Sequence, residues 1–166
     1  MAGRSELPIL VKLKKELAEL QRELNVELPK ELATAAAHGD LSENAEYDAA
    51  KGRQEYVRSR IGQLATRIRE LSMYDVASIP EGRVAYGSEV LVEDVDEGTQ
   101  STYEIVFPEE VDAGQGRISL SSPIGRALLN REEGDEVEVI TPQGRRSYQI
   151  LGLKTFRERG VTDGKG

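Results

Sequence analysis

The chain has 166 residues, contains no cysteine or tryptophan, and carries a formal net charge of −8 at pH 7. Without cysteine it can form neither a disulfide nor a thiolate-ligated zinc site. No apolar run approaches the roughly 20 residues needed to cross a bilayer, and the first residues lack the apolar core of a secretory signal. We therefore expect a cytoplasmic protein that has no membrane partner.

The charge is unevenly placed along the chain. Residues 1–74 carry 12 basic and 12 acidic side chains, whereas residues 75–166 carry 10 basic and 18 acidic ones. An acidic chain binds a phosphate backbone poorly, because like charges repel and no counterions are released. Any nucleic acid is therefore expected to be met locally, inside a partner's complex.

Two heptad patterns occupy the first half. Apolar residues recur at alternating spacings of three and four, first as Leu10, Leu13, Leu17, Leu20 and Leu24, and again as Val57, Ile61, Leu64, Ile68 and Leu71. Each pattern predicts a helix with one apolar side that needs a second helix. We expect residues 1–77 to form an antiparallel coiled-coil hairpin with arms about 40–45 Å long.

Two features of the first arm and the turn refine this hairpin. Pro29 removes one backbone donor, which predicts a kink or a short break in the first arm. Towards the turn the apolar positions are small, which predicts a thin end where the two helices approach closely; these residues are Ala33, Ala36, Ala37, Ala45, Ala49 and Ala50.

The second half has a strand-like pattern. Five segments read as strands, at residues 88–93, 102–106, 117–120, 136–140 and 147–151. Ser122 and Pro123 are typical of an N-cap and a first helical residue, so a short helix is expected to follow. The sequence thus predicts an α+β chain in which residues 78–156 form a small antiparallel sheet domain with one helix, followed by a polar tail over residues 157–166.

The turn between the two predicted helices concentrates negative charge. Residues 38–48 contain four carboxylates, Asp40, Glu43, Glu46 and Asp48, and no lysine or arginine. Such a turn could hold a divalent cation that another molecule also holds. A purely structural interpretation is also open, because Asp40 and Glu43 have the spacing of a capping box that starts the second helix. His38, the single histidine, is expected to have a structural or C-cap role.

Two separate blocks resemble one family. Residues 39–47 resemble the signature of the bacterial GreA/GreB transcript cleavage factors, and residues 118–128, with Gly134-Asp135 and residues 141–144 after them, resemble a second family block. The resemblance extends from about Leu10 to Leu153. It implies an N-terminal antiparallel coiled coil followed by an FKBP-like C-terminal domain.

The same resemblance implies a function and a partner. Such a factor enters the secondary channel of RNA polymerase and stimulates endonucleolytic cleavage of nascent RNA in backtracked, arrested complexes. Asp40 and Glu43 would help hold a second Mg²⁺ in the polymerase active site, so the ion would be shared and not bound stably by this chain alone. The chain would not be an enzyme by itself, and we expect a monomer.

Further candidate residues lie in both halves. Asn44, Glu46 and Tyr47 are auxiliary residues of the turn. The family commonly has an arginine two residues before the histidine, where this chain has Ala36. Lys51 and Arg53 are candidates for a reduced contact with the RNA 3′ end, which would favour cleavage of short backtracked ends.

In the second half, the candidates for docking on polymerase are Ser122, Pro123 and Arg126. Their structural alternative is the start of a capped helix, just as the alternative for Lys51 and Arg53 is an ordinary solvated face.

Three alternative functions remain open at this point. The nearest is a factor of the same fold that enters the secondary channel and inhibits polymerase without stimulating cleavage. The others are a free-standing prolyl isomerase carried on a coiled coil, and a structural adaptor that dimerises through its heptads.

Overall fold

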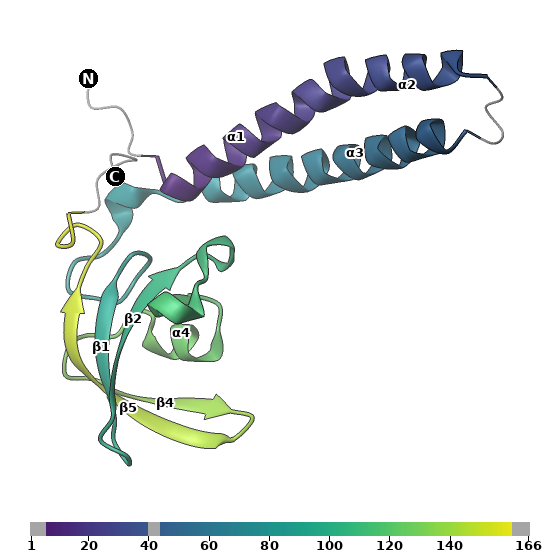
Figure 1. Ribbon diagram of the computed structural model, residues 1–166. Helices are drawn as coiled ribbons and strands as arrows, with labels where there is room; N and C mark the ends of the chain where they lie inside the picture. The colour runs from purple at the N-terminus through teal and green to yellow at the C-terminus, as the bar shows by residue number, and fades with distance from the viewer. Residues whose placement is uncertain (1–5, 40–43, 161–166) are drawn as a thin grey trace. The chain divides into compact units, whose positions relative to one another are not determined.

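The computed structural model (Figure 1) describes residues 6–39 and 44–160, and the chain divides into two compact units. The helical unit comprises residues 6–75, and the sheet unit follows from Val76. No helix in the described ranges combines the length and the apolar character required of a membrane span.

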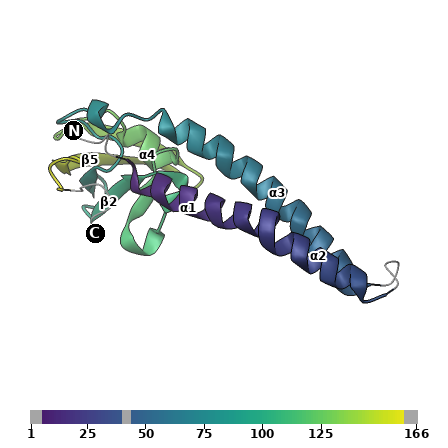
Figure 2. The same cartoon turned by 90° about the horizontal axis from the view of Figure 1, so that it is seen from above.

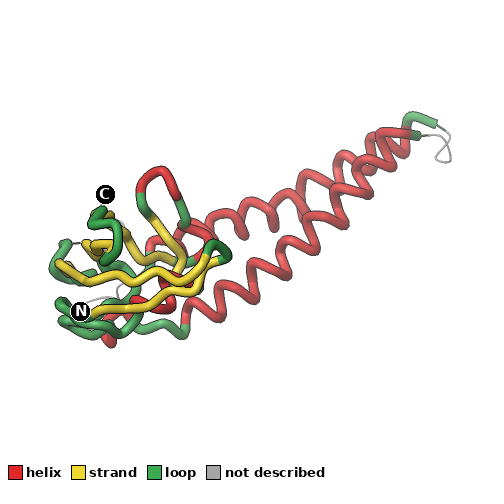
Figure 3. Tube along the Cα trace, turned by 90° about the horizontal axis from the view of Figure 1, so that it is seen from below, coloured by secondary structure: helices red, strands yellow, loops and turns green. Residues whose placement is uncertain are grey.

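The helical unit is an antiparallel hairpin. Its first arm consists of α1 (Pro8–Arg22), a π-helical segment η1 (Glu23–Glu27) and α2 (Leu28–Ala37), and its second arm is the single 28-residue helix α3 (Ala45–Ser72). Figures 2 and 3 show both arms of the hairpin running beside each other. The prediction of two long helices is confirmed.

Heptad packing holds the arms together. The fully buried side chains of α3 recur every seven residues, at Ala50, Val57, Leu64 and Leu71. On the first arm the buried residues are Ile9, Leu10 and Leu13 in α1, and Leu28 and Ala35 in α2. The alanine prediction was therefore only partly correct: Ala50 is buried, whereas Ala33, Ala36, Ala37, Ala45 and Ala49 are exposed.

The π-helical segment explains that error. In η1 the backbone N–H of Leu28 donates to the carbonyl of Glu23, five residues earlier. One extra residue is thereby inserted into the helix, which advances the apolar side by one position. A heptad continued from Leu24 would place residues 27, 31 and 34 in the interface. Instead Leu28 and Ala35 are buried and Leu32 is half-buried.

Pro29 lies just after this segment, at the start of α2. Because proline has no backbone N–H and its ring crowds the carbonyl four residues earlier, a regular helix is disfavoured here. The predicted break is present, and its form is the π-helical segment η1.

Five strands form the sheet unit: β1 (Glu89–Asp94), β2 (Gln100–Val106), β3 (Arg117–Ser119), β4 (Glu136–Thr141) and β5 (Gly144–Lys154). Their order in the sheet is β3-β2-β1-β5-β4. Short 3₁₀ helices η3 (Val76–Ser78), η4 (Pro108–Glu110) and η5 (Ala113–Gln115) lie in the connections, and helix α4 (Pro123–Leu128) follows β3. The α+β prediction, with one helix in this half, is confirmed.

The sheet is not wholly antiparallel, which corrects the prediction. β3 runs parallel to β2, with Glu104 opposite Arg117 and Val106 opposite Ser119. Two consecutive strands can run parallel only if the connection between them carries the chain back to the level at which the first strand's paired residues begin. Here β3 pairs only with the last three residues of β2, so the short helices η4 and η5 suffice for the return.

One apolar core supports the sheet and α4. Val90, Val92, Ile105 and Ile150 from three strands pack with Leu128 of α4. Side chains alternate between the two faces of a strand, and β1 follows this rule, with Val90, Val92 and Asp94 buried.

The sheet unit closes on its own first segment. Phe156 packs against Gly87. Only glycine fits well at position 87, because the backbone φ is +81° and because an added Cβ would lie 2.3 Å from the Phe156 ring. The Arg159 guanidinium donates to the Gly87 carbonyl at 2.8 Å and to Glu104 at 3.0 Å. Residues 157–160, which were predicted to begin a polar tail, thus form a turn bonded to the domain.

Candidate functional site: the end of the helical hairpin

The predicted metal-holding carboxylates lie outside the described residues. Asp40 and Glu43 fall in the interval between residues 39 and 44. The structure describes the two helix ends that flank them. Helix α2 ends at Ala37 with His38 as its C-cap, followed by Gly39 at a φ of +121°. Helix α3 begins at Ala45.

Asn44 joins these two helix ends. Its side-chain oxygen accepts a hydrogen bond from the Tyr47 backbone N–H at 3.1 Å, which makes it the N-cap of α3. Its side-chain nitrogen donates to the Ala35 carbonyl, in the last turn of α2, at 2.5 Å. This half-buried residue therefore satisfies a first-turn N–H of α3 that has no intrahelical partner, and adds a second hydrogen bond to the Ala35 carbonyl, which the His38 backbone N–H also reaches.

The N-cap at Asn44 corrects the structural interpretation of the two carboxylates. A capping box would have put Asp40 at the N-cap and Glu43 three residues into the helix. The structure instead begins α3 at Ala45 with Asn44 as its cap, four residues later than the capping box predicted; Asp40 and Glu43 themselves lie outside the described residues. Glu46 and Asp48 lie in the first turn of α3, where negative charge is favoured by the positive end of the helix dipole.

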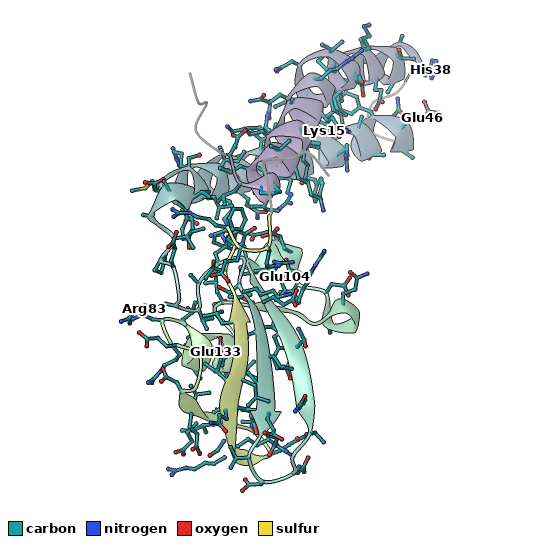
Figure 4. The ribbon with its side chains drawn as sticks, turned by 90° about the vertical axis from the view of Figure 1, so that its left-hand side faces the viewer. Lys15, His38, Glu46, Arg83, Glu104 and Glu133 are labelled. Carbon is teal, nitrogen blue, oxygen red and sulfur yellow. The ribbon has the colours of Figure 1, made fainter. Side chains whose placement is uncertain are left out.

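A second contact crosses the same gap. His38 Nδ1 lies 3.3 Å from Glu46 Oε2, and Figure 4 labels both side chains at this end of the hairpin. Both side chains are more than half exposed, so solvent screens this pair. The C-cap prediction for His38 is confirmed by its backbone N–H, which donates to the Ala35 carbonyl.

The two RNA-contact candidates differ in what they touch. Arg53 makes a bidentate ion pair with Glu23 of η1, with Nε and Nη2 at 2.6 and 2.9 Å from the carboxylate oxygens. This hydrogen bonding lowers the pKa of Glu23 and raises the pKa of Arg53. Lys51 is exposed, with its ammonium 5.9 Å from the centre of the Tyr47 ring. The Glu23 partner was missed by the sequence prediction.

A shallow groove lies between α2 and α3 near this end. Its volume is about 440 Å³, and its lining residues are Lys30, Glu31, Thr34 and Ala35 of α2 with Glu46, Ala49, Ala50 and Arg53 of α3. Alanines make the apolar floor and long charged side chains make the rim.

The docking candidates of the sheet unit form the start of α4. Ser122 is the N-cap, accepting from the Gly125 backbone N–H at 3.1 Å, and Pro123 is the first helical residue. Arg126 is exposed. The capped helix predicted for these residues is confirmed, while docking on polymerase remains a prediction.

A half-buried acid in the sheet unit was missed. Glu110 accepts from the Tyr86 hydroxyl at 2.9 Å, and the Tyr86 ring stacks on Phe107 with centroids 4.4 Å apart. Burial raises the pKa of Glu110. No sequence pattern pointed to this group, because it depends on contacts between residues 24 positions apart.

Comparison with known proteins agrees with this architecture. The sequence profile described as "Transcription elongation factor, N-terminal" matches residues 9–72, and that described as "Transcription elongation factor, GreA/GreB, C-term" matches residues 79–155. These two ranges correspond closely to the helical and sheet units.

Individual relatives cover most of the chain. Transcription elongation factor GreA of Anaeromyxobacter sp. (strain K) is 44% identical over 154 residues, covering 93% of each chain. GreA of Hyphomonas neptunium is 44% identical over 137 residues, covering 81% of this chain and 87% of its own. The crystal structure of GreA factor homolog 1 of Thermus thermophilus aligns with a TM-score of 0.40 and 25% identity, covering 87% of this chain and 94% of its own. On its sequence, the chain belongs to the GreA/GreB family of transcription elongation factors.

Proposed function

We propose that this transcription elongation factor acts on RNA polymerase by entering its secondary channel and stimulating cleavage of nascent RNA in backtracked complexes. The observation that carries the proposal is the hairpin end. The family's acidic turn lies between two antiparallel helices, and the cap of α3 is supplied by Asn44. The start of α3 therefore requires neither Asp40 nor Glu43 as its cap.

The chemistry of the donor set fits Mg²⁺. This ion prefers oxygen ligands and is usually bound through one or two carboxylates, keeping several of its waters. Asp40 and Glu43 would hold it from this chain, and polymerase would complete the site. Such an ion lowers the pKa of a bound water and stabilises charge during phosphodiester hydrolysis. Acting alone, the chain would not be an enzyme.

The test is cleavage in a stalled, backtracked polymerase complex with Mg²⁺. We compare the wild type with Asp40→Asn and Glu43→Gln, which keep side-chain size and remove the charged ligand. Loss of a metal ligand should reduce stimulation on the order of a hundredfold or more, because metal assistance contributes several kcal/mol. Binding to polymerase, measured by competition with labelled wild type, should be unchanged.

The matched control is Asp48→Asn, which removes one negative charge from the first turn of α3 at an exposed position. It should keep nearly full stimulation. An equal loss of cleavage stimulation in all three variants would mean that the acids act through their summed negative charge and not as metal ligands. Binding without any stimulation by the wild type would instead favour the channel-entering inhibitor.

A further inference from the structure

Asn44 makes one hydrogen bond more than a helix cap requires. An N-cap needs only an acceptor for a backbone N–H of the first turn, and Ser, Thr, Asp and Asn all supply one. The Asn44 oxygen fills that need through Tyr47 N–H at 3.1 Å. Its amide nitrogen is then left to donate to the Ala35 carbonyl at 2.5 Å, a bond that Asp, Ser and Thr at the cap position could not make in the same way.

This extra bond fixes the two helix ends against each other. Ala35 is buried in the helix interface, and its carbonyl also accepts from the His38 backbone N–H at 3.1 Å. The acceptor therefore belongs to the last turn of α2, and the donor to the cap of α3. The exposed His38–Glu46 contact crosses the same gap but is screened by solvent. Asn44 thus provides the less exposed of the two links.

We propose that Asn44 is a positioning residue for the cleavage reaction. It sets the spacing of the two helix ends from which the segment with Asp40 and Glu43 departs. This inference rests on the proposed function and adds a residue that acts through the metal-holding acids without touching the metal. Partners that orient ligands from outside a metal site typically contribute about 10- to 100-fold to metal affinity.

The test separates the cap from the link. Asn44→Ser and Asn44→Asp both keep a capping oxygen and both lose the amide donor to Ala35. Asn44→Ser adds no charge, so agreement between the two variants excludes a purely electrostatic effect. Both should unfold within a few degrees of the wild type and bind polymerase as tightly. The Mg²⁺ concentration for half-maximal cleavage should rise about tenfold, and saturating Mg²⁺ should restore the rate.

A second readout uses the full-length chain without polymerase. Spin labels at the exposed Ala37 and Ala49 report the spacing of α2 and α3 near the gap. Their distance distribution should broaden in both variants. An unchanged distribution and an unchanged Mg²⁺ requirement would overturn the positioning role. A broadened distance distribution in both variants, with no cleavage stimulated by any form of the factor, the wild type included, would instead refute the proposed function. It would still support the role of Asn44 in fixing the spacing of the two helix ends.

Discussion

Deleting one residue from η1 tests why the first arm contains a π-helical segment. Between Leu24 and Ala35 the apolar residues are spaced by four, four and three, whereas a continuous heptad from Leu24 would have three, four and three. Removing the exposed Asn25 makes the spacing regular and leaves the Glu23–Arg53 ion pair in place. The deletion is made in a Pro29→Ala background, because proline within a regular helix costs about 3 kcal/mol.

The matched control is the same deletion in the other arm. Removing the exposed Arg58 shortens the interval between Val57 and Leu64, both fully buried. Each residue turns an α-helix by about 100°. Deleting Arg58 therefore rotates the two parts of α3 relative to each other, and the apolar side of one part must leave the interface. Exposing Val57 alone costs about 1.5–3 kcal/mol, and its apolar partners on the first arm lose contacts as well. A total of about 3 kcal/mol or more is expected.

Thermal unfolding followed by helical circular dichroism measures both variants. Because about 1 kcal/mol shifts the midpoint of a domain of this size by roughly 4–8 °C, the Arg58 deletion should lower the midpoint by at least about 12 °C. The Asn25 deletion should leave the midpoint at or above that of the Pro29→Ala parent. If both deletions lower the midpoint equally, then η1 does not absorb an inserted residue and the reasoning is wrong.

Three further predictions concern the half-buried acid Glu110 and two glycines. Burial raises the pKa of Glu110 above 4.5, so its stabilising contribution is present below the unfolded pKa and lost as pH rises through the folded one. Glu110→Gln should therefore reduce the fall of the unfolding midpoint as pH rises above 4.5. Gly125→Ala should destabilise the sheet unit by about 1–3 kcal/mol, because its Cβ would lie 2.1 Å from the Ser119 carbonyl oxygen. Gly52→Ala, in open space within α3, should stabilise the chain by about 1 kcal/mol; a loss would contradict the helix argument.

Much of the fold could be predicted because its signals are periodic. The leucine spacing identifies both arms, and alternation identifies the strands. The break at η1 was also readable, since Leu28, Leu32 and Ala35 fall one position later than the heptad requires. The parallel pairing of β2 with β3 was not predictable, because alternation of side chains carries no information on strand direction.

The hairpin end shows a different limit. Asp40 and Asn44 are both residue types that cap helices well, so local sequence alone could not decide between them. The choice is made by tertiary structure: Asn44 also reaches the Ala35 carbonyl, nine residues away. Bonds of this kind, like the Glu23–Arg53 pair, appear only when two distant segments are placed side by side.

The pairing of β1 with β5 has a consequence for synthesis of the chain. These central strands come from opposite ends of the sheet unit, and the closing turn at residues 157–160 is bonded back to residues 77–87. The hairpin is complete in sequence by residue 75, and N-terminal domains fold first as chains are made. At about 5–20 residues per second, the hairpin exists for several seconds before the sheet can close. During each round of translation, a hairpin with an acidic turn is therefore presented by a ribosome-bound chain whose second domain is still unfolded.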